Sequence, residues 1–317
     1  MQFSFIKCHG SGNDFPLIDA RALSLSDAGW AGVARALADR DGPVGGDGLL
    51  LLTTGDEDCA FGMRMFNSDG SEAETCLNGL RCTARLGFEV LGLEQATVRL
   101  KTSVAQVARD AELAPGVATV RTVVGPNSVA AADVGLRIEA EQVIEAVVPG
   151  LPSARAFTAV AMPNPHLVTF VDAVDEEELV SLGSWCEGAP ALIPARANVS
   201  FVEVRRDADL FVRTFERGVG LTNSCGSAMA ASVLAAGLTG RVPFDAQVRV
   251  FNKGGLVRGR ASADRVVTIS GNATFLYDAS VQVDVAAGRA EVPVMHARRE
   301  DEAAAWRAAV AGLASAS

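Results

Sequence analysis

The segment MRMFNSDGSEAETCLNGLRC, residues 63–82, combines a strand, a polar turn and the start of a helix. Apolar side chains alternate up to Phe66, which predicts a β-strand. Asn, Ser, Asp and Gly follow within residues 67–71, as is typical of a tight turn. Apolar residues then recur at helical spacing between Cys76 and Gly92. We therefore predict a helix that begins at the cysteine and ends near the glycine.

A related arrangement recurs in the second half of the chain. The run RMFN before Cys76 corresponds to RTFE before Cys225. Asn67 lies nine residues before Cys76, and Glu216 lies nine residues before Cys225, so the two runs are offset by 149 residues. The stretch GSAMAASVLAAGLTG after Cys225 also predicts a helix. Each half of the chain therefore presents a strand, a turn and a cysteine that opens a helix.

Two further pairs of polar residues support a duplication. Asn13 in HGSGNDF matches Asn164 in AMPNPH, and Asp47 in GGDGLL matches Asn198 in ARANVSF, both at an offset of 151 residues. The chain thus consists of two copies of one strand-rich unit. Strands are predicted at QFSFIK, GLLLLTT, CAFGMRMF, ATVRLKT and VATVRTVV.

The composition restricts the functions that are open to this chain. Its 317 residues, 49% hydrophobic and 21% charged, predict a globular protein of about two domains. The net charge of −10 argues against nucleic-acid and anionic-membrane partners, which require basic patches, but permits a small charged metabolite. The first residues contain no apolar run of signal-peptide length, and runs such as LLLL at 49–52 are too short to span a bilayer. We expect a cytoplasmic protein.

The six cysteines fit neither a disulfide framework nor a zinc site. They are scattered along a long chain and no pair has CxxC spacing, while the three histidines stand apart from one another. We expect no metal. Two cysteines open predicted helices, and the others are expected to be packing residues: Cys8, Cys59, Cys82 and Cys186.

Two cysteines at helix starts favour one chemistry in particular. A helix N-terminus carries unpaired N–H groups and about half a positive charge, so it can bind a carboxylate and lower the pKa of a cysteine from about 8.5. Two such starts, facing each other across a cleft, would place thiols on opposite sides of one small anion. One thiolate would remove the α-proton of an amino acid, and the other thiol would return a proton to the opposite face, without a cofactor. The two thiols would then titrate as a coupled pair.

The motifs HGSGNDF, MRMFNSDGSEAETCLNGLRC, PNPH, ARANVSF and FERGVGLTNSCGS together resemble those of the diaminopimelate epimerase family over residues 3–277. The resemblance implies an α/β (α+β) fold of two pseudo-symmetric lobes, each a mixed, barrel-like sheet around a central helix. It also implies an enzyme that interconverts LL- and meso-diaminopimelate for lysine and peptidoglycan synthesis, with a small-molecule amino-acid substrate and no cofactor.

The resemblance further implies roles for individual residues. Cys76 and Cys225 match the acid/base pair, which His166 and Glu216 respectively would assist. Backbone N–H groups would hold the reacting carboxylate at Leu77, Asn78, Gly226 and Ser227. Substrate contacts, chiefly to the distal amino-acid end, are implied at Asn13, Gly48, Asn67, Asn164, Asn198, Glu216 and Arg217.

Each assignment has a purely structural alternative. His166 precedes an apolar strand and could be a hydrogen-bonded edge residue, and Glu216 with Arg217 could be a surface ion pair of little energetic value. Asn67 would suit any tight turn, and we expect Asp69 to serve the turn only.

Several positions depart from the family pattern and keep other functions open. Leu77 replaces a glycine, Leu221 a glutamate, Ala228 a glycine, and Gly48 a glutamine found in some members. The alternatives are a racemase of another amino acid, such as histidine or a proline derivative, a dehydratase or double-bond isomerase of the same fold, and a catalytically silent binding protein. Retention of Arg217 and of the four asparagines favours diaminopimelate.

The chain is expected to divide into two lobes and an extension. The lobe that contains Cys76 would comprise residues 1–123 and 272–285, and the lobe that contains Cys225 would comprise residues 124–271. The last strand, near 272–280, would return to the first lobe. From about Val281 the chain departs from the family pattern, and residues 286–317 would form a C-terminal extension. There we predict added strands at 281–295 and a helix at 299–313 with Trp306, Val310 and Leu313 on one stripe. This extension would cap a core, contact a second subunit of a homodimer, or remain a solvated tail.

Overall fold

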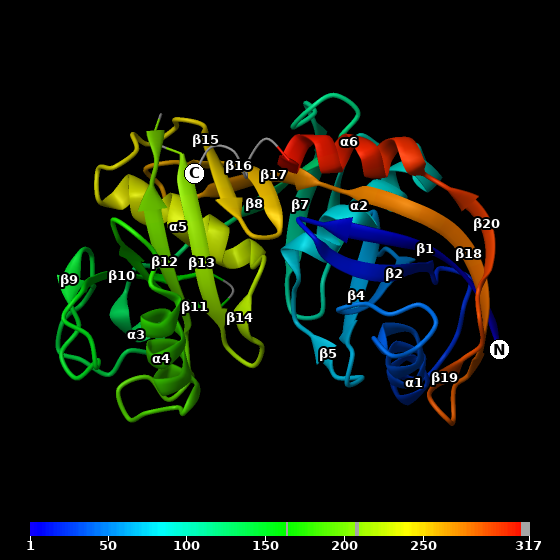
Figure 1. The fold of residues 1–317 in the computed structure, drawn as a ribbon, viewed down its shortest axis with the longest axis horizontal. Helices are drawn as coiled ribbons and strands as arrows, with labels where there is room; N and C mark the ends of the chain where they lie inside the picture. The colour runs from blue at the N-terminus through cyan, green and yellow to red at the C-terminus, as the bar shows by residue number, and fades with distance from the viewer. Residues whose placement is uncertain (163, 207–208, 312–317) are drawn as a thin grey trace. The chain divides into compact units, whose positions relative to one another are not determined.

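The computed structural model describes residues 1–162, 164–206 and 209–311, and the chain divides into two compact units. The first lobe comprises Met1–Thr122 and the residues from Ser270 onward, and the second lobe comprises Val123–Ile269 (Figure 1). The chain therefore passes from one lobe to the other twice. No helix in these ranges has the length and apolar character that crossing a membrane requires.

The first lobe is one mixed sheet with a helix after its second and fifth strands. β1 is antiparallel to β2, β2 is parallel to β3 across α1, and β3 is antiparallel to β4. β4 is antiparallel to β5 and, across α2, parallel to β6, which is antiparallel to β7. The elements are β1 (Gln2–Gly10), β2 (Asn13–Asp19), α1 (Asp27–Ala38), β3 (Gly48–Thr54), β4 (Phe61–Asn67), β5 (Glu72–Ala73), α2 (Leu77–Leu91), β6 (Gln95–Arg99), β7 (Val104–Asp110) and β8 (Thr119–Val124).

The second lobe repeats this order of strands and helices. β10 is antiparallel to β11, β11 is parallel to β12 across α4, β12 is antiparallel to β13, and β13 is parallel to β15 across α5. The predicted duplication and fold class are thereby confirmed. The elements are α3 (Ala131–Val134), β9 (Ala146–Val147), β10 (Ala156–Ala161), β11 (Pro165–Phe170), α4 (Glu176–Glu187), β12 (Asn198–Val204), β13 (Leu210–Glu216), β14 (Gly220–Thr222), α5 (Gly226–Leu238), β15 (Val248–Asn252), β16 (Gly255–Ala261) and β17 (Val267–Asn272).

α2 and α5 are the buried helices of their lobes. Every residue of α5 from Gly226 to Gly237 is buried, which suits a helix made almost entirely of small and apolar side chains. α2 is buried from Leu77 to Phe88 and ends at Gly92, whose φ of 67° is the left-handed conformation typical of a helix C-terminus. Both predicted helices are confirmed.

α1 and α4 are helices that the sequence analysis did not predict. Ser26 accepts a hydrogen bond from the N–H of Gly29 at the start of α1, and Asp175 accepts from Glu177 and Glu178 at the start of α4. Each helix packs against the sheet of its own lobe through an apolar face.

The last three strands of the described chain pack on the first lobe. β18 (Thr274–Asp284) pairs with β1, and β20 (Val294–Arg298) pairs with β18, while β19 (Arg289–Ala290) closes a short ladder on β18. Through its pairing with β1, β18 joins the sheet of the first lobe.

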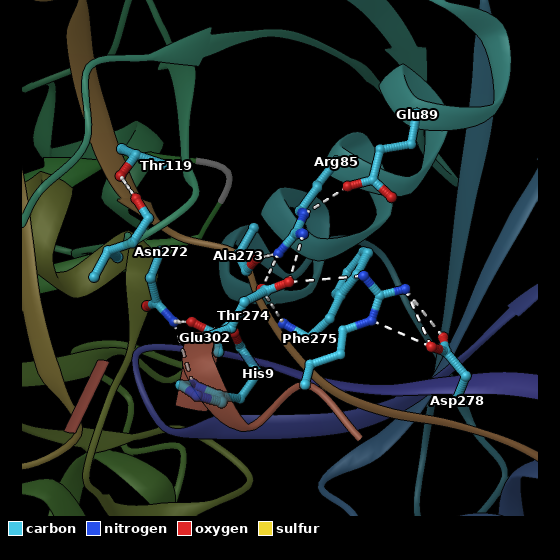
Figure 2. Close-up of polar contacts among 12 residues, drawn as sticks. His9, Arg85, Glu89, Thr119, Asn272, Ala273, Thr274, Phe275, Asp278 and Glu302 are labelled. Carbon is cyan, nitrogen blue, oxygen red and sulfur yellow. Dashed lines mark hydrogen bonds and ion pairs between the residues drawn. The ribbon is translucent and has the colours of Figure 1, made fainter. Parts of the chain in front are cut away.

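α6 (Glu300–Ala311) then lies against the same lobe. Its Glu302 carboxylate accepts hydrogen bonds from the Arg85 guanidinium (2.9 Å) and from the N–H of Phe275 (3.2 Å), as Figure 2 shows. Trp306 is buried with its ring centroid 5.6 Å from that of His9, and Val310 is half-buried. Leu313, the third member of the predicted stripe, lies outside the described residues. The extension thus covers part of the first lobe, and its predicted role in a subunit contact stays a prediction.

Candidate active site

Cys76 occupies the N-cap position of α2 in the first lobe. Its extended backbone (φ −149°, ψ 104°) lets the sulfur accept a hydrogen bond from the N–H of Gly79 at 3.4 Å. The same sulfur lies 3.8 Å from Oδ1 of Asn13, which can accept a hydrogen bond from Cys76 only in the thiol form of that cysteine. The side chain is half-buried, so the sulfur keeps some exposure to solvent.

Asn13 is held in position by the chain around it. It follows a tight turn in which Ser11 and Gly12 both have positive φ (51° and 81°). Its amide nitrogen donates to the carboxylate of Asp47, and its oxygen accepts from Nδ2 of Asn78 at 3.5 Å. The structure therefore brings together three of the predicted residues of the first lobe, Asn13, Cys76 and Asn78.

Gly48 and Asn67 face each other in the ladder between β3 and β4. A Cβ atom at Gly48 would lie 2.4 Å from the carbonyl oxygen of Phe66, so this position has no room for a side chain. Nδ2 of Asn67 donates to the hydroxyl of Ser71 (2.9 Å), and Asp69 accepts from both the N–H and the hydroxyl of Ser71. Asp69 thus serves the turn, as predicted, and the amide of Asn67 takes part in the same turn.

Cys225 occupies the N-cap position of α5 in the second lobe, again with extended backbone (φ −117°, ψ 111°). Its side chain is buried, and the sulfur lies 3.5 Å from the hydroxyl oxygen of Ser227. The thiol is also hydrogen-bonded to the carboxyl group of Glu216, the last residue of β13. Predicted residues from the strand and from the helix therefore meet at the second cysteine.

The expectation that a helix start lowers the cysteine pKa is wrong for Cys225. Burial raises its pKa well above the ordinary value, and the neighbouring charge of Glu216 raises it further, against a smaller lowering by the Ser227 hydroxyl. Burial likewise raises the pKa of Glu216, although the hydrogen bond from Cys225 and the charge of Arg217 act in the opposite direction. Cys225 is consequently a protonated thiol at neutral pH.

His166 is a buried, neutral imidazole between two asparagines. Its Nε2 lies 2.8 Å from Oδ1 of Asn164 and 3.4 Å from Nδ2 of Asn198, the residue opposite it in the parallel ladder of β11 and β12. Burial, aided by the charge of Arg217, lowers the pKa of His166 to about 3. Among the described residues, its Nδ1 atom has no hydrogen-bond partner.

Arg217 is a half-buried cation beside this group. Its backbone N–H donates to Oδ1 of Asn198 at 2.9 Å, and its guanidinium donates to the carbonyl of Ala195 at 3.1 Å. No ion pair in the described part of the chain includes Arg217. A guanidinium that lacks a carboxylate can bind an anionic ligand through paired hydrogen bonds.

The predicted site residues thus fall into two groups, one in each lobe. Sequence reasoning missed two residues that organise the first group: Asp47, which it used only as a landmark, and Arg81, whose guanidinium donates to Oδ1 of Asn78 (2.8 Å). A cation five residues after the helix-opening Cys76 was visible in the sequence, but its burial was not. Leu77, Asn78, Gly226 and Ser227 form the first turns of α2 and α5, as predicted.

A family model described as diaminopimelate epimerase matches residues 5–110 and 158–276. The chain belongs to the diaminopimelate epimerase family. The matched residues include every predicted site position of both groups.

Curated relatives from this family are similar over most of their length. A diaminopimelate epimerase of Listeria innocua is 39% identical over 88% of this chain and 88% of its own. That of Clostridium acetobutylicum is 36% identical over 90% of this chain and 87% of its own. Among solved structures, a hydroxyproline epimerase of Agrobacterium vitis superposes with a TM-score of 0.62 at 13% identity, over 90% of this chain and 93% of its own, which shows a shared fold.

Proposed function

We propose that this protein interconverts LL- and meso-2,6-diaminopimelate, using the thiols of Cys76 and Cys225 as its acid/base pair and no cofactor. The observation that carries the proposal is that the equivalent helices of the two lobes, α2 and α5, both begin at a cysteine. The family model and the curated relatives support the choice of diaminopimelate as substrate.

The reaction requires the two lobes to place the sulfurs on opposite sides of one α-carbon. The thiolate of one cysteine takes the α-proton, and the electron pair left on carbon delocalises into the adjacent carboxylate. The thiol of the other cysteine then donates its proton to the opposite face, which inverts the centre and leaves the thiols with exchanged protonation states. Preorganised N–H donors stabilise the developing negative charge. In this proposal they are the backbone N–H groups of Leu77, Asn78, Gly226 and Ser227.

The distal end of the substrate would be held by Arg217 and by amide groups. A carboxylate matches the guanidinium of Arg217, which forms no ion pair within the described ranges, and an ammonium group matches amide oxygens. Asn198 orients Arg217 through its backbone N–H. Asn13, Asn67 and Asn164 would complete the contacts, whereas Gly48 would contribute only its backbone because a side chain there would overlap Phe66.

We assign supporting roles to His166 and Glu216. Glu216 is hydrogen-bonded to the Cys225 thiol and would share its proton. His166 is neutral at physiological pH, so it would assist Cys76 as a hydrogen-bonding group and not as a cation.

The wider setting follows from this assignment. We propose that residues 1–123 with 272–285 and residues 124–271 act as the two epimerase lobes, and that the protein works in the cytoplasm as a homodimer, in lysine and peptidoglycan precursor synthesis. A racemase of histidine or of a proline derivative, and a silent binding protein, are not favoured. The relatives at 36% and 39% identity carry the name diaminopimelate epimerase, whereas the likeness to the hydroxyproline epimerase, at 13% identity, is one of fold.

Incubation with LL- or meso-diaminopimelate in heavy water tests the proposal. We expect deuterium at the α-carbon and the same final mixture of stereoisomers from either starting material. Proline, hydroxyproline and histidine serve as substrate controls and should exchange at least a hundredfold more slowly. Absence of deuterium from diaminopimelate, with a well-folded protein, would show that the chain is not an epimerase of this substrate.

A further inference from the structure

Arg81 is a fully buried cation, and its hydrogen-bond partners among the described residues are all uncharged. Its Nη1 donates to the carbonyl of Leu77 (3.3 Å), and its Nη2 donates to Oδ1 of Asn78 (2.8 Å) and to the hydroxyl of Ser11 (3.1 Å). Its Nε donates to the carbonyl of Asn272 (3.1 Å). The guanidinium therefore lies beside the first turn of α2, the turn that Cys76 begins.

The backbone around Arg81 leaves room for the guanidinium where two glycines approach it. A Cβ atom on Gly271 would lie 2.6 Å from Cζ of Arg81, and one on Gly10 would lie 3.0 Å from Nη2 and 2.6 Å from the carbonyl oxygen of Asn78. Even alanine at either position would displace the side chain or the backbone. This pocket is closely shaped to a guanidinium.

The other cations on the strands that pack against α2 are neutralised. Each has a carboxylate at hydrogen-bonding or short ion-pair distance, and His9 is held neutral at pH 7 because burial lowers its pKa to about 4. Of the acids on these strands, Asp19 pairs with Arg21, and Asp110 accepts from Ser270. The pairs on these strands are Lys7 with Asp14, Arg64 with Glu72, Arg99 with Asp56 and Arg109 with Glu94; in the loop before β3, Arg40 pairs with Asp14 and Asp47, and on α2 itself Arg85 pairs with Glu89 and Glu302.

Arg81 differs from all of these, because no described ion pair includes it. Burial lowers its pKa to about 10, so it stays charged at neutral pH, and the charges that act on it in the opposite direction are those of two cysteines, Cys82 and Cys76. A buried positive charge without an anion is costly, which makes a nearby negative charge favourable. Cys82 lies inside α2 and is fully buried, whereas Cys76 is half-exposed at the helix start, where the N–H groups also favour an anion.

We propose that Arg81 is a positioning residue whose buried charge stabilises the thiolate of Cys76, so that Cys76 is the proton acceptor of the resting protein. The proposal rests on the proposed role of Cys76 in proton transfer. The equivalent position in the second lobe, five residues after Cys225, is Ala230, which is buried and uncharged. The resting protein then holds one thiolate and one thiol, as two-base chemistry requires, and first accepts the stereoisomer whose α-proton faces Cys76.

Alkylation of the full-length protein by iodoacetamide, followed for each cysteine by peptide mass spectrometry between pH 5 and pH 10, tests this assignment. In the natural protein, the rate for Cys76 should rise with a midpoint below about 8.5, the value of a free thiol. In Arg81→Met the midpoint should move up by at least about one pH unit, which lowers the rate at pH 7 about tenfold. Arg81→Lys, which keeps a cation, should restore most of the low midpoint.

Two features of the experiment separate charge from structural damage. The rate at the high-pH plateau reports access to the sulfur, whereas the midpoint reports its charge. Arg85→Met removes a cation from the same helix, but one already paired with Glu302 and Glu89, and should leave the Cys76 midpoint unchanged. Should Arg81→Met fail to fold, Arg81→Gln carries the same prediction and keeps an amide donor for Asn78.

The proposal is overturned if Cys76 of the natural protein titrates at or above about 8.5, or if its midpoint is the same in a folded Arg81→Met or Arg81→Gln variant. Because alkylation needs no substrate, these results are independent of turnover. A protein that shows the predicted midpoints but no deuterium exchange would contradict the proposed function and leave the charge assignment intact.

Discussion

The starts of α2 and α5 share a backbone arrangement and differ in charge. In both lobes a strand, a turn and a two- or three-residue strand lead to a cysteine at the N-cap position. Near Cys76 lie the buried guanidinium of Arg81 and the neutral side chain of Asn13, whereas the Cys225 thiol is hydrogen-bonded to the carboxyl group of Glu216. The two lobes thus share the backbone arrangement of the helix start, and in our proposal the charged groups around it make the two thiols electrostatically unlike. Equivalent positions in a repeat can hold the two protonation states of one reaction.

Removal of either thiol should have the largest effect. We expect Cys76→Ala and Cys225→Ala each to lower the epimerisation rate by at least about a thousandfold, because each removes one of the two groups that transfer the proton. Cys82→Ala, which alters a buried cysteine of α2 away from the helix start, is the matched control and should keep most activity. Turnover close to that of the natural protein in Cys76→Ala or Cys225→Ala would show that the altered cysteine does not transfer the proton.

Glu216→Gln should make the two thiols more alike. The charge of Glu216 raises the pKa of Cys225, so its removal lowers that pKa and increases the thiolate fraction at any pH below it. Alkylation of Cys225 at pH 8 should become about tenfold faster, the rate for Cys76 should not change, and epimerisation should slow by about ten- to a hundredfold. Glu203→Gln, on the neighbouring strand β12, is the control. Slower or unchanged alkylation of Cys225 would mean that Glu216 does not set its charge.

Arg217→Met should weaken binding more than chemistry. Loss of a charge-assisted pair with the distal carboxylate should raise KM about ten- to a hundredfold and change kcat less. Arg196→Met, a cation of the same lobe that is paired with Glu187, is the control. An unchanged KM would exclude Arg217 from the substrate site. The charge difference between the lobes would then matter only at the two cysteines.

The sequence was sufficient to predict the duplicated unit, because a strand, a turn and a cysteine-led helix are local patterns. The family resemblance also singled out Asn13, Cys76 and Asn78 as site residues, and the structure places these three together. α1 and α4 were missed although their N-cap residues, Ser26 and Asp175, are start signals that the sequence displays.

Long-range burial was beyond the sequence. Arg81 lies against two residues far away in the chain, Gly10 and Gly271, and no described ion pair includes it. Separation along the chain also explains why the sequence led us to expect a lowered pKa for Cys225. A helix start is a local feature, whereas burial of the thiol and its contact with Glu216 depend on the folded lobe.

The smallest expected effect concerns the stability of the first lobe. Glu302→Ala would leave Arg85, the paired cation of α2, with Glu89 alone, and should lower the free energy of unfolding by about 1 to 2 kcal/mol in urea titrations. Burial raises the pKa of Glu302, but Arg85 and the N–H of Phe275 lower it by more, so the net shift is downward. The stabilisation is therefore fully present above the pKa of an unfolded glutamate, about 4.3, and is lost as pH falls through the lower pKa of the folded state.

The control variant is Asp301→Ala, on the exposed side of α6, which should change the free energy of unfolding much less. Equal stability of the two variants would show that the extension does not support α2.

The central claim is that the two unlike thiols serve one carbon atom, and mild oxidation tests it most directly. If the two sulfurs face one carbon from opposite sides, they can come together and form a disulfide once the substrate is absent. Peptide mapping after oxidation should find Cys76 linked to Cys225, with loss of activity that a reductant restores and that bound diaminopimelate slows. Oxidation that modifies each cysteine separately, with no link between them and with activity retained, would contradict the account.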